Sequence, residues 1–452
     1  MDQDLSQHVN YATAQSLLDG FTDQKRPLEI LGLTGSGDAA LLARSLGQNS
    51  RPLFIVCSSQ KEAQRLFTDL QFFATRPKRI GFFPHWELGP YDPLTPHPEI
   101  EANRLDALVR LLKGEIDAVV VSLRALMQRV IPRPILAELS LVLDHEEEYP
   151  REELLQQLHN LGYQAVPLVE DRGSFAVRGD IVDIFPADSP QPVRLDFYGD
   201  FIERMRLFDP ASQRSQPGEL KQLRLIPSRE LCLSGQHLDC LLHKLKERCD
   251  EMELPRNLRE GISEELREGI LAPGRAFLLP FNYPGLETLF DYLPEADLIL
   301  NDPPAIEQEI DLFNAEIRAG EKRQSDNQLP HARRQDLYLN ADELETAFAH
   351  YRRIDLSRLQ VFQLDDERLS YHFDCSGNAD LRASLAPGQD GLNPLLNRLE
   401  TWSEEDWRVL LVCRQPGQAQ RLQELLRENG WELPIREQSS LDKLSTGTPQ
   451  LQ

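Results

Sequence analysis

The stretch Ile30-Leu31-Gly32-Leu33-Thr34-Gly35-Ser36-Gly37-Asp38-Ala39 joins a short apolar run to a helix-forming segment through a glycine-rich turn. The run at residues 28–33 predicts a buried strand, and the residues from Asp38 onward predict the first turns of a helix. This is the context of a P-loop. In such loops backbone N–H groups surround a phosphate, a Lys reaches the β and γ oxygens, and a Ser or Thr hydroxyl holds Mg²⁺.

The loop lacks both of these side chains. Gly32 and Gly37 have the required spacing, with Gly35 between them, but Asp38 occupies the position of the Lys and Ala39 that of the hydroxyl. A carboxylate at this point would repel a bound polyphosphate. Because a glycine-rich turn between a strand and a helix also arises by chance in α/β proteins, the other half of a nucleotide site has to decide between the two interpretations.

The other half is an acidic pair at the end of an apolar strand, which NTPases use to hold the metal and to position the attacking water. The best candidate is the run at residues 297–301, which is followed by Asp302 and then by Pro303. Proline cannot replace the acidic partner. We therefore predict a degenerate acidic box, a degenerate nucleotide loop and no catalytic residues in a chain with the fold of a motor domain.

Composition limits the classes of function. The chain has 452 residues, enough for three or four domains, and a net charge of −24. That charge disfavours tight nonspecific binding to duplex DNA, which depends on cation contacts with phosphates. We expect a cytoplasmic protein without membrane contact, because the sequence has no signal peptide, no apolar run of the ~18 residues needed to span a bilayer, and six cysteines without a C-x-x-C pair.

A metal site is not predicted. His85, Asp92 and His97 lie in a proline-rich loop without the spacing of metal ligands, so we interpret them as ordinary loop residues. Along the chain, strands and helices alternate as far as about residue 134, which predicts a mostly parallel sheet. Densely alternating strands follow, and then a largely helical region that ends in a polar segment near residue 334.

The strand Val193–Tyr198 alternates between apolar and polar residues. Arg194, Asp196 and Tyr198 should point away from the apolar face, so we expect substitutions there to leave folding intact. An Arg beside an aromatic residue is a common composition for an interface hot spot. The alternative is a solvated sheet face with a cross-strand ion pair, and periodicity alone does not separate the two.

Several motifs together resemble a known family. The runs at 32–37 (GLTGSG), 177–186 (VRGDIVDIFP), 194–200 (RLDFYGD) and 289–294 (LFDYLP) resemble the excision-repair protein UvrB. The runs at 86–92 (WELGPYD) and 126–130 (LMQRV), with the degenerate loop, are more similar to the N-terminal, UvrB-like half of bacterial transcription-repair coupling factors (Mfd).

The resemblance implies an α/β fold. It consists of a degenerate P-loop domain of the RecA or helicase type, split by an inserted α+β domain that docks UvrA, and then a small α/β domain of unknown role. We place the inserted domain at 141–227, the split domain at 1–140 and 228–334, including a helical linker, and the small domain at 335–452. ATP, Mg²⁺, RNA polymerase and DNA would belong to the absent C-terminal half, and no cofactor is expected in this chain.

Carried over by position, Arg178 and Arg194 match the family's contacts with UvrA, and Tyr198 stands where relatives can carry Phe. The loop at 86–98 leaves no room for the damage-probing hairpin of UvrB. The expected function is a catalytically silent adaptor that recruits UvrA to RNA polymerase stalled at DNA lesions. The alternatives are a UvrB-like ATP-dependent enzyme that processes damaged DNA, and a clamp that contacts and masks other parts of the full-length protein.

Overall fold

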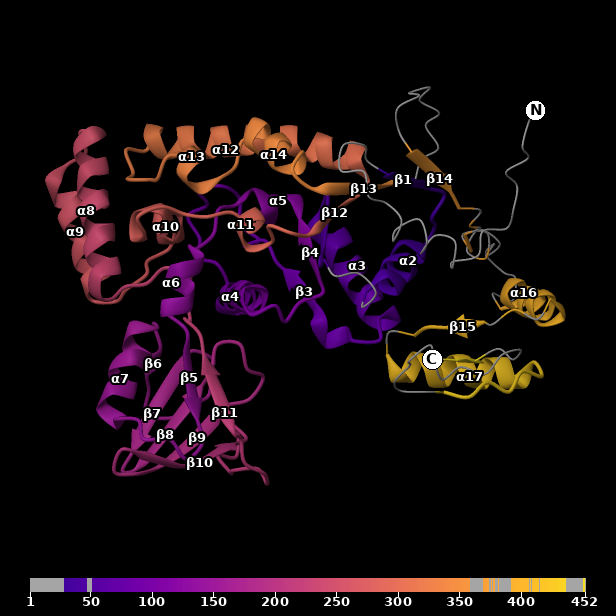
Figure 1. The fold of residues 1–452 in the computed structure, drawn as a ribbon, viewed down its shortest axis with the longest axis horizontal. Helices are drawn as coiled ribbons and strands as arrows, with labels where there is room; N and C mark the ends of the chain where they lie inside the picture. Colours follow the sequence, from indigo (N-terminus) through magenta and orange to yellow (C-terminus); the bar gives the residue numbers. More distant parts are fainter. Residues whose placement is uncertain are drawn as a thin grey trace.

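The computed structural model describes residues 28–46, 51–357, 369–373, 392–405 and 415–435, together with a few positions between and after these ranges. Its centre is a seven-stranded sheet of order β14-β1-β13-β12-β2-β4-β3, in which all neighbours are parallel (Figure 1). The strands are β1 (Leu28–Leu31), β2 (Leu53–Cys57), β3 (Ile80–Phe83), β4 (Ala118–Ser122), β12 (Asp297–Asn301), β13 (Arg352–Ser357) and β14 (Leu369–His372).

Both faces of this sheet are covered. Strand β2 is buried along its whole length, as expected of a parallel strand between two helical layers. Its residues alternate between two cores: Leu53 and Ile55 pack with α2 (Gly37–Ser45) and α3 (Gln60–Phe73), while Phe54 and Val56 enter the larger core on the other face. The larger core contains side chains of α4 (Pro98–Leu112), α5 (Leu123–Met127) and α12 (Pro303–Asp326).

A second domain interrupts the first. After α6 (Arg133–Glu138) the chain leaves at β5 (Leu141–Asp144) and returns at β11 (Gln222–Leu225), and these two strands pair with each other. Between them, helix α7 (Arg151–Asn160) packs on a five-stranded sheet of order β10-β9-β8-β7-β6. Its strands are β6 (Gln164–Ala165), β7 (Ser174–Arg178), β8 (Ile181–Phe185), β9 (Val193–Tyr198) and β10 (Phe201–Leu207).

The chain then completes the first domain. Helices α8 (Gly235–Glu251), α9 (Arg256–Arg267), α10 (Leu279–Asn282) and α11 (Leu289–Tyr292) lead back to β12. Helix α12 extends to Asp326 and packs on the sheet through Phe313 and Ile317, so it is part of this domain rather than a linker between two units. Gly320 is required there because a Cβ at that position would lie 2.5 Å from the carbonyl oxygen of Pro90. The predicted fold class, a parallel-sheet domain split by a β-rich insertion, is confirmed.

The predicted start of the small domain at residue 335 is wrong. Helices α13 (Arg334–Leu337) and α14 (Ala341–Phe348) pack in the larger core, and β13 lies between β1 and β12 in the central sheet. Strand β14 forms the edge of the same sheet. The separate cluster begins later, with α16 (Asn393–Glu404), β15 (Leu410–Leu411), which pairs with β16 (Gln450–Leu451), and α17 (Pro416–Glu428) around Leu399 and Leu426.

A buried polar network fixes the segment that follows the insertion against the first domain. The Arg104 guanidinium, fully buried on α4, is ion-paired with Glu230 and donates to the carbonyl of Pro84 at 2.8 Å. Glu230 also accepts a hydrogen bond from the Trp86 indole at 2.9 Å, and its backbone N–H donates to Glu101 at 3.4 Å. Burial, with the nearby Glu230 carboxylate, raises the pKa of Glu101 to about 8 from its usual 4.5.

This pKa predicts the effect of replacing Glu101→Gln. The side chain stays neutral in the folded protein up to about pH 8 but ionises near pH 4.5 when unfolded, so stability contributed below pH 4.5 is lost as the pH rises to 8. Gln can still accept from the N–H of Glu230 and does not ionise. We expect the variant to be about 1–3 kcal/mol more stable than the native protein at pH 8, with the difference vanishing below pH 4.5. Urea unfolding at the two pH values measures this.

The matched control is Glu203→Gln, which removes a carboxylate that is already exposed to water on β10 and so separates burial from the loss of one negative charge. Equal stabilisation of the Glu101→Gln variant at pH 8 and below pH 4.5 would contradict the explanation.

Candidate functional site

The predicted strand, turn and helix form as expected at the glycine-rich stretch. Strand β1 ends at Leu31, the chain turns through Gly32 (φ 79°) and Gly35 (φ 60°), and α2 begins at Gly37, whose N–H donates to the carbonyl of Thr34 at 3.0 Å. The turn lies at the carboxyl end of a parallel strand, where open α/β sheets bind ligands. Its position therefore agrees with the prediction of a nucleotide loop, and the side chains determine what it can hold.

The Asp38 carboxylate has a cation from its own chain. Its Oδ2 lies 2.6 Å from a guanidinium nitrogen of Arg65 on α3, and its side chain is only 7% exposed. Arg65 also contacts Asp69 at 2.9 Å and Glu62 at 3.3 Å. Burial alone would lower the pKa of Arg65, but the bond to Asp38 raises it above the usual value. The sequence analysis singled out Asp38 and missed Arg65, although Arg65 at i+3 from Glu62 and i−4 from Asp69 has the spacing of an ion-paired helix residue.

The first glycine of the loop is covered by the strand beside it. The N–H of Phe373 donates to the carbonyl of Leu31 at 2.9 Å. A Cβ on Gly32 would lie 2.1 Å from the Phe373 carbonyl oxygen and 3.1 Å from the His372 ring. Protein atoms thus fill the space directly over Gly32.

The acidic-box candidate forms a strand-to-helix turn. Asp302 is the N-cap of α12 with φ 68°, and Pro303 is its first residue, a position where the missing N–H costs no hydrogen bond. The neighbouring Asn301 amide contacts the Cys57 thiol at 3.7 Å, and burial raises the pKa of that thiol to about 12. Among the residues that the structure describes, no group of three or more His, Cys, Asp or Glu side chains is arranged to hold a metal ion.

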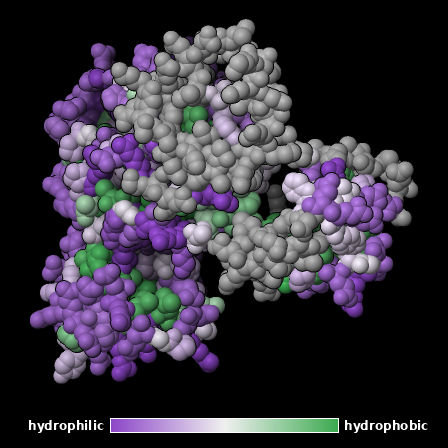
Figure 2. Space-filling model, turned by 45° about the vertical axis from the view of Figure 1, so that its right-hand side comes forward, coloured by the Kyte–Doolittle hydropathy of each residue, from purple (hydrophilic) through white to green (hydrophobic). Residues whose placement is uncertain are grey.

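The second candidate region is the sheet of the inserted domain. Val193, Leu195 and Phe197 of β9 are buried against α7, as the alternation predicted. The opposite side, called the outer face here, carries the polar residues. By strand register it contains Arg178, Ile181, Asp183, Arg194, Asp196, Tyr198, Phe201, Arg204 and Arg206. The three predicted contact residues therefore share one face. The visible side of this domain, at the lower left of Figure 2, is largely hydrophilic with small hydrophobic patches.

Arg194 is held inside the domain, and its contacts argue against the expectation that it could be removed without affecting folding. Its guanidinium grips the fully buried Asp183 carboxylate with two hydrogen bonds of 2.7 and 2.9 Å and lies 4.8 Å from the centre of the Phe208 ring. Only 15% of its side chain is exposed. Asp183 lies directly opposite Arg194 on the adjacent strand β8, so the cross-strand ion pair of the alternative interpretation exists.

Arg178 and Tyr198 are differently placed. Tyr198 is 82% exposed at the end of β9. Arg178 is exposed at the end of β7, and its guanidinium donates to the carbonyl of Pro167 at 3.2 Å. Both side chains can be reached by a partner without any rearrangement of the sheet, and their role as contacts remains a prediction.

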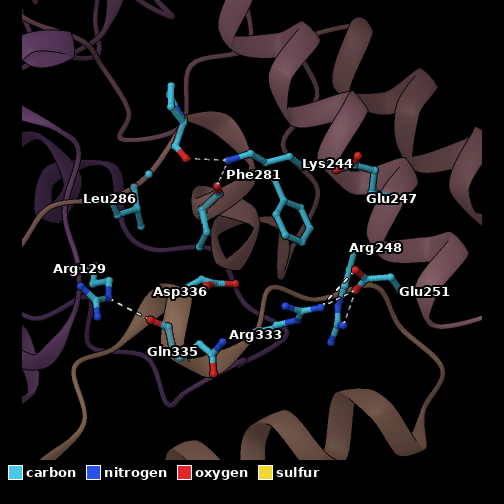
Figure 3. A pocket seen from close by; sticks show the side chains of 13 residues that line it. Arg129, Lys244, Glu247, Arg248, Glu251, Phe281, Leu286, Arg333, Gln335 and Asp336 are labelled. Carbon is cyan, nitrogen blue, oxygen red and sulfur yellow. Dashed lines mark hydrogen bonds and ion pairs between the residues drawn. The ribbon is translucent and has the colours of Figure 1, made fainter. Parts of the chain in front are cut away.

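A cavity of about 490 Å³ lies beside α8, but its cations are already used (Figure 3). Lys244 contacts the Pro280 carbonyl at 3.2 Å, and Arg129 that of Gln335 at 3.0 Å. Arg248 and Arg333 both contact Glu251, at 3.1 and 3.0 Å. Because each of these cations already contacts an acceptor within the protein, we assign no ligand to this cavity.

Comparison with known proteins agrees with this architecture. The family model described as UvrB interaction domain matches residues 141–231. The transcription-repair-coupling factor of Myxococcus xanthus is 33% identical over 93% of this chain and 36% of its own length. The transcription-repair-coupling factor of Escherichia coli (strain K12) is 30% identical over 87% of this chain and 33% of its own length. The UvrABC system protein B of Thermus thermophilus is 26% identical over 63% of this chain and 47% of its own length.

The split parallel-sheet domain and its insertion define a UvrB-like module. The chain spans about a third of the length of the coupling factors it matches. It is a UvrB-like module of the transcription-repair-coupling-factor type, which confirms the resemblance stated above. None of the described helices combines the length and apolar character needed to cross a membrane.

The ion pair on the outer face predicts that Arg194→Ala destabilises the protein. Removal of the guanidinium leaves the Asp183 carboxylate buried and unpaired, which costs about 3–5 kcal/mol. We expect a clearly lower melting temperature, and expect Asp183→Ala combined with Arg194→Ala to cost less than the sum of the two single changes.

Arg178→Ala is the control, because its exposed guanidinium contacts only a carbonyl oxygen among the hydrogen bonds described, and its stability should lie within about 0.5 kcal/mol of that of the native protein. Native-like melting of Arg194→Ala would show that the pair contributes nothing to folding.

Proposed function

We propose that this module recruits UvrA through the outer face of the inserted domain and so links nucleotide excision repair to RNA polymerase stalled at DNA lesions. The observation that carries the proposal is the exposure of Arg178 and Tyr198 on one face of a domain that matches the UvrB interaction domain. An exposed Arg and Tyr on a rigid sheet are typical interface anchors. Contacts with RNA polymerase and DNA, and any masking of this face, would come from parts of the full-length protein outside this chain.

The module acts by protein contact in the cytoplasm and has no catalytic role. The Asp38–Arg65 pair supports this part of the proposal because it places a carboxylate, neutralised from within, where a nucleotide site needs a cation. Residues 372–373 lie over Gly32, and Pro303 stands in place of the second acidic residue. No ATP or Mg²⁺ is therefore assigned to it. The competing proposal, a UvrB-like ATP-dependent enzyme, requires the same loop to bind nucleotide.

Substitutions at Tyr198 test the recruitment proposal. Tyr198→Ala should weaken UvrA binding by about 2 kcal/mol, or roughly thirtyfold in Kd, because it removes an exposed ring that a partner would bury. Tyr198→Phe keeps the ring and should bind within about threefold of the native chain. The measurement is a titration of immobilised chain with purified UvrA.

The matched control is Trp407→Ala, an exposed aromatic residue outside the inserted domain, which should leave binding unchanged. If the unsubstituted chain does not bind UvrA, the recruitment proposal is wrong.

The second prediction of this proposal concerns nucleotide. The chain should show no ATP hydrolysis in single-turnover assays and no heat of ATP binding in calorimetry. The variant carrying Asp38→Lys and Ala39→Thr should remain inactive, because the introduced ammonium would face Arg65 and because residues 372–373 still cover Gly32. Hydrolysis by the unsubstituted chain above the level of a mock preparation would favour the enzyme.

A further inference from the structure

Four strands place one residue each on a single line across the outer face. Arg178 on β7 lies opposite Ile181 on β8, Ile181 lies opposite Asp196 on β9, and Asp196 lies opposite Arg204 on β10. Neighbouring strands are about 4.8 Å apart, so the two arginines at the ends of the line are separated by about 14 Å at their Cα atoms. Arg204 was not a candidate in the sequence analysis because its strand register was not known.

The arginines of the outer face fall into two kinds. Arg194 is bound to the buried Asp183, and Arg206 donates to Asp196. Arg204 is 52% exposed, and its contact with Glu219 is long, at 3.8 Å between two side chains that are both about half exposed. Such a surface pair is worth little and is readily exchanged for another carboxylate. Arg178 and Arg204 are therefore the cations of this face that can turn to a partner, whereas Arg194 and Arg206 hold the sheet.

Two exposed aromatic residues lie beside this line. Tyr198 and Phe201 are opposite each other where β9 turns into β10, and Phe201 is 38% exposed beside the 82% exposed Tyr198. Ile181, half-buried, lies on the line itself. Aromatic residues exposed on a rigid hairpin have few rotamers to lose on binding, so they are effective anchors.

We propose that the partner surface taken by this face is acidic and is gripped at two points about 14 Å apart, by Arg178 at one end and Arg204 at the other, with Tyr198 and Phe201 filling an apolar socket. This proposal rests on the recruitment proposed above and specifies the chemistry of the UvrA patch that docks. The whole chain carries a charge of −24 and repels an acidic partner at long range, so the two arginines also select this face over the rest of the surface. Arg194 is a positioning residue that keeps β8 and β9 in register beneath the contact layer.

The test is a charge series at Arg204 in the full chain, titrated with purified UvrA in physiological salt. Arg204→Lys should bind within about threefold of native, Arg204→Gln about fivefold more weakly, and Arg204→Glu at least about thirtyfold more weakly. The same order is expected at Arg178. A merely structural role would not rank Gln above Glu, since the side chain is half exposed and all the variants should melt as the native chain does.

Lys322→Glu makes the same charge change at an exposed position on α12, outside the inserted domain, and should alter binding by less than about twofold. Unchanged binding of Arg204→Glu, or an equal loss with Lys322→Glu, overturns the two-point grip while leaving recruitment intact. Absence of UvrA binding by the native chain instead overturns the recruitment proposal, and this inference with it.

Discussion

The buried pair of Arg104 and Glu230 anchors the chain where it returns from the insertion to the first domain. Two full charges removed from water are costly, and the arrangement is stable only because each partner has further hydrogen bonds, to Pro84 on one side and Trp86 on the other. Glu230 follows directly after the insertion, so the pair fixes the returning chain. Arg224 of β11 adds a second tie, with contacts of 2.6 Å to Asp106 on α4 and 2.9 Å to Asp188. A domain attached at buried charges is held in a defined orientation, and the outer face is presented accordingly.

The sequence allowed the fold to be predicted wherever the pattern within a single strand or helix is sufficient. The alternation in Val193–Tyr198 correctly gave the buried and exposed sides of β9. It did not give the partner of Arg194, because Asp183 lies on another strand and only the register of β8 with β9 brings them together. Periodicity gives the direction of a side chain, whereas what the side chain meets depends on pairing. The same limit explains why Arg204 was overlooked.

Parallel pairing caused the other main error. β13 was assigned to a separate domain because nothing near it in the sequence shows that Ile354 aligns with Leu28 at the start of the sheet and with Ile299 of β12. Parallel neighbours are joined only through a crossover of about a dozen residues or more, so short-range patterns in the sequence do not reveal the pairing. The loop at 32–37 was predicted correctly because its strand, turn and helix are local. The ion pair of Asp38 with Arg65 was not predicted, because α3 meets α2 only in the folded protein.

The internal ion pair at this loop has a consequence for how the module behaves in a cell. A ligand stabilises a fold only to the extent that it binds the folded state, so proteins whose loops close around ATP gain or lose stability with the nucleotide supply. Here the cation that pairs with the loop carboxylate Asp38 is Arg65, which belongs to the chain itself and is present in every molecule. Under the function proposed above, in which this loop takes no nucleotide, the stability of this domain would not follow the ATP supply, and a starved cell would present the same surface as a growing one.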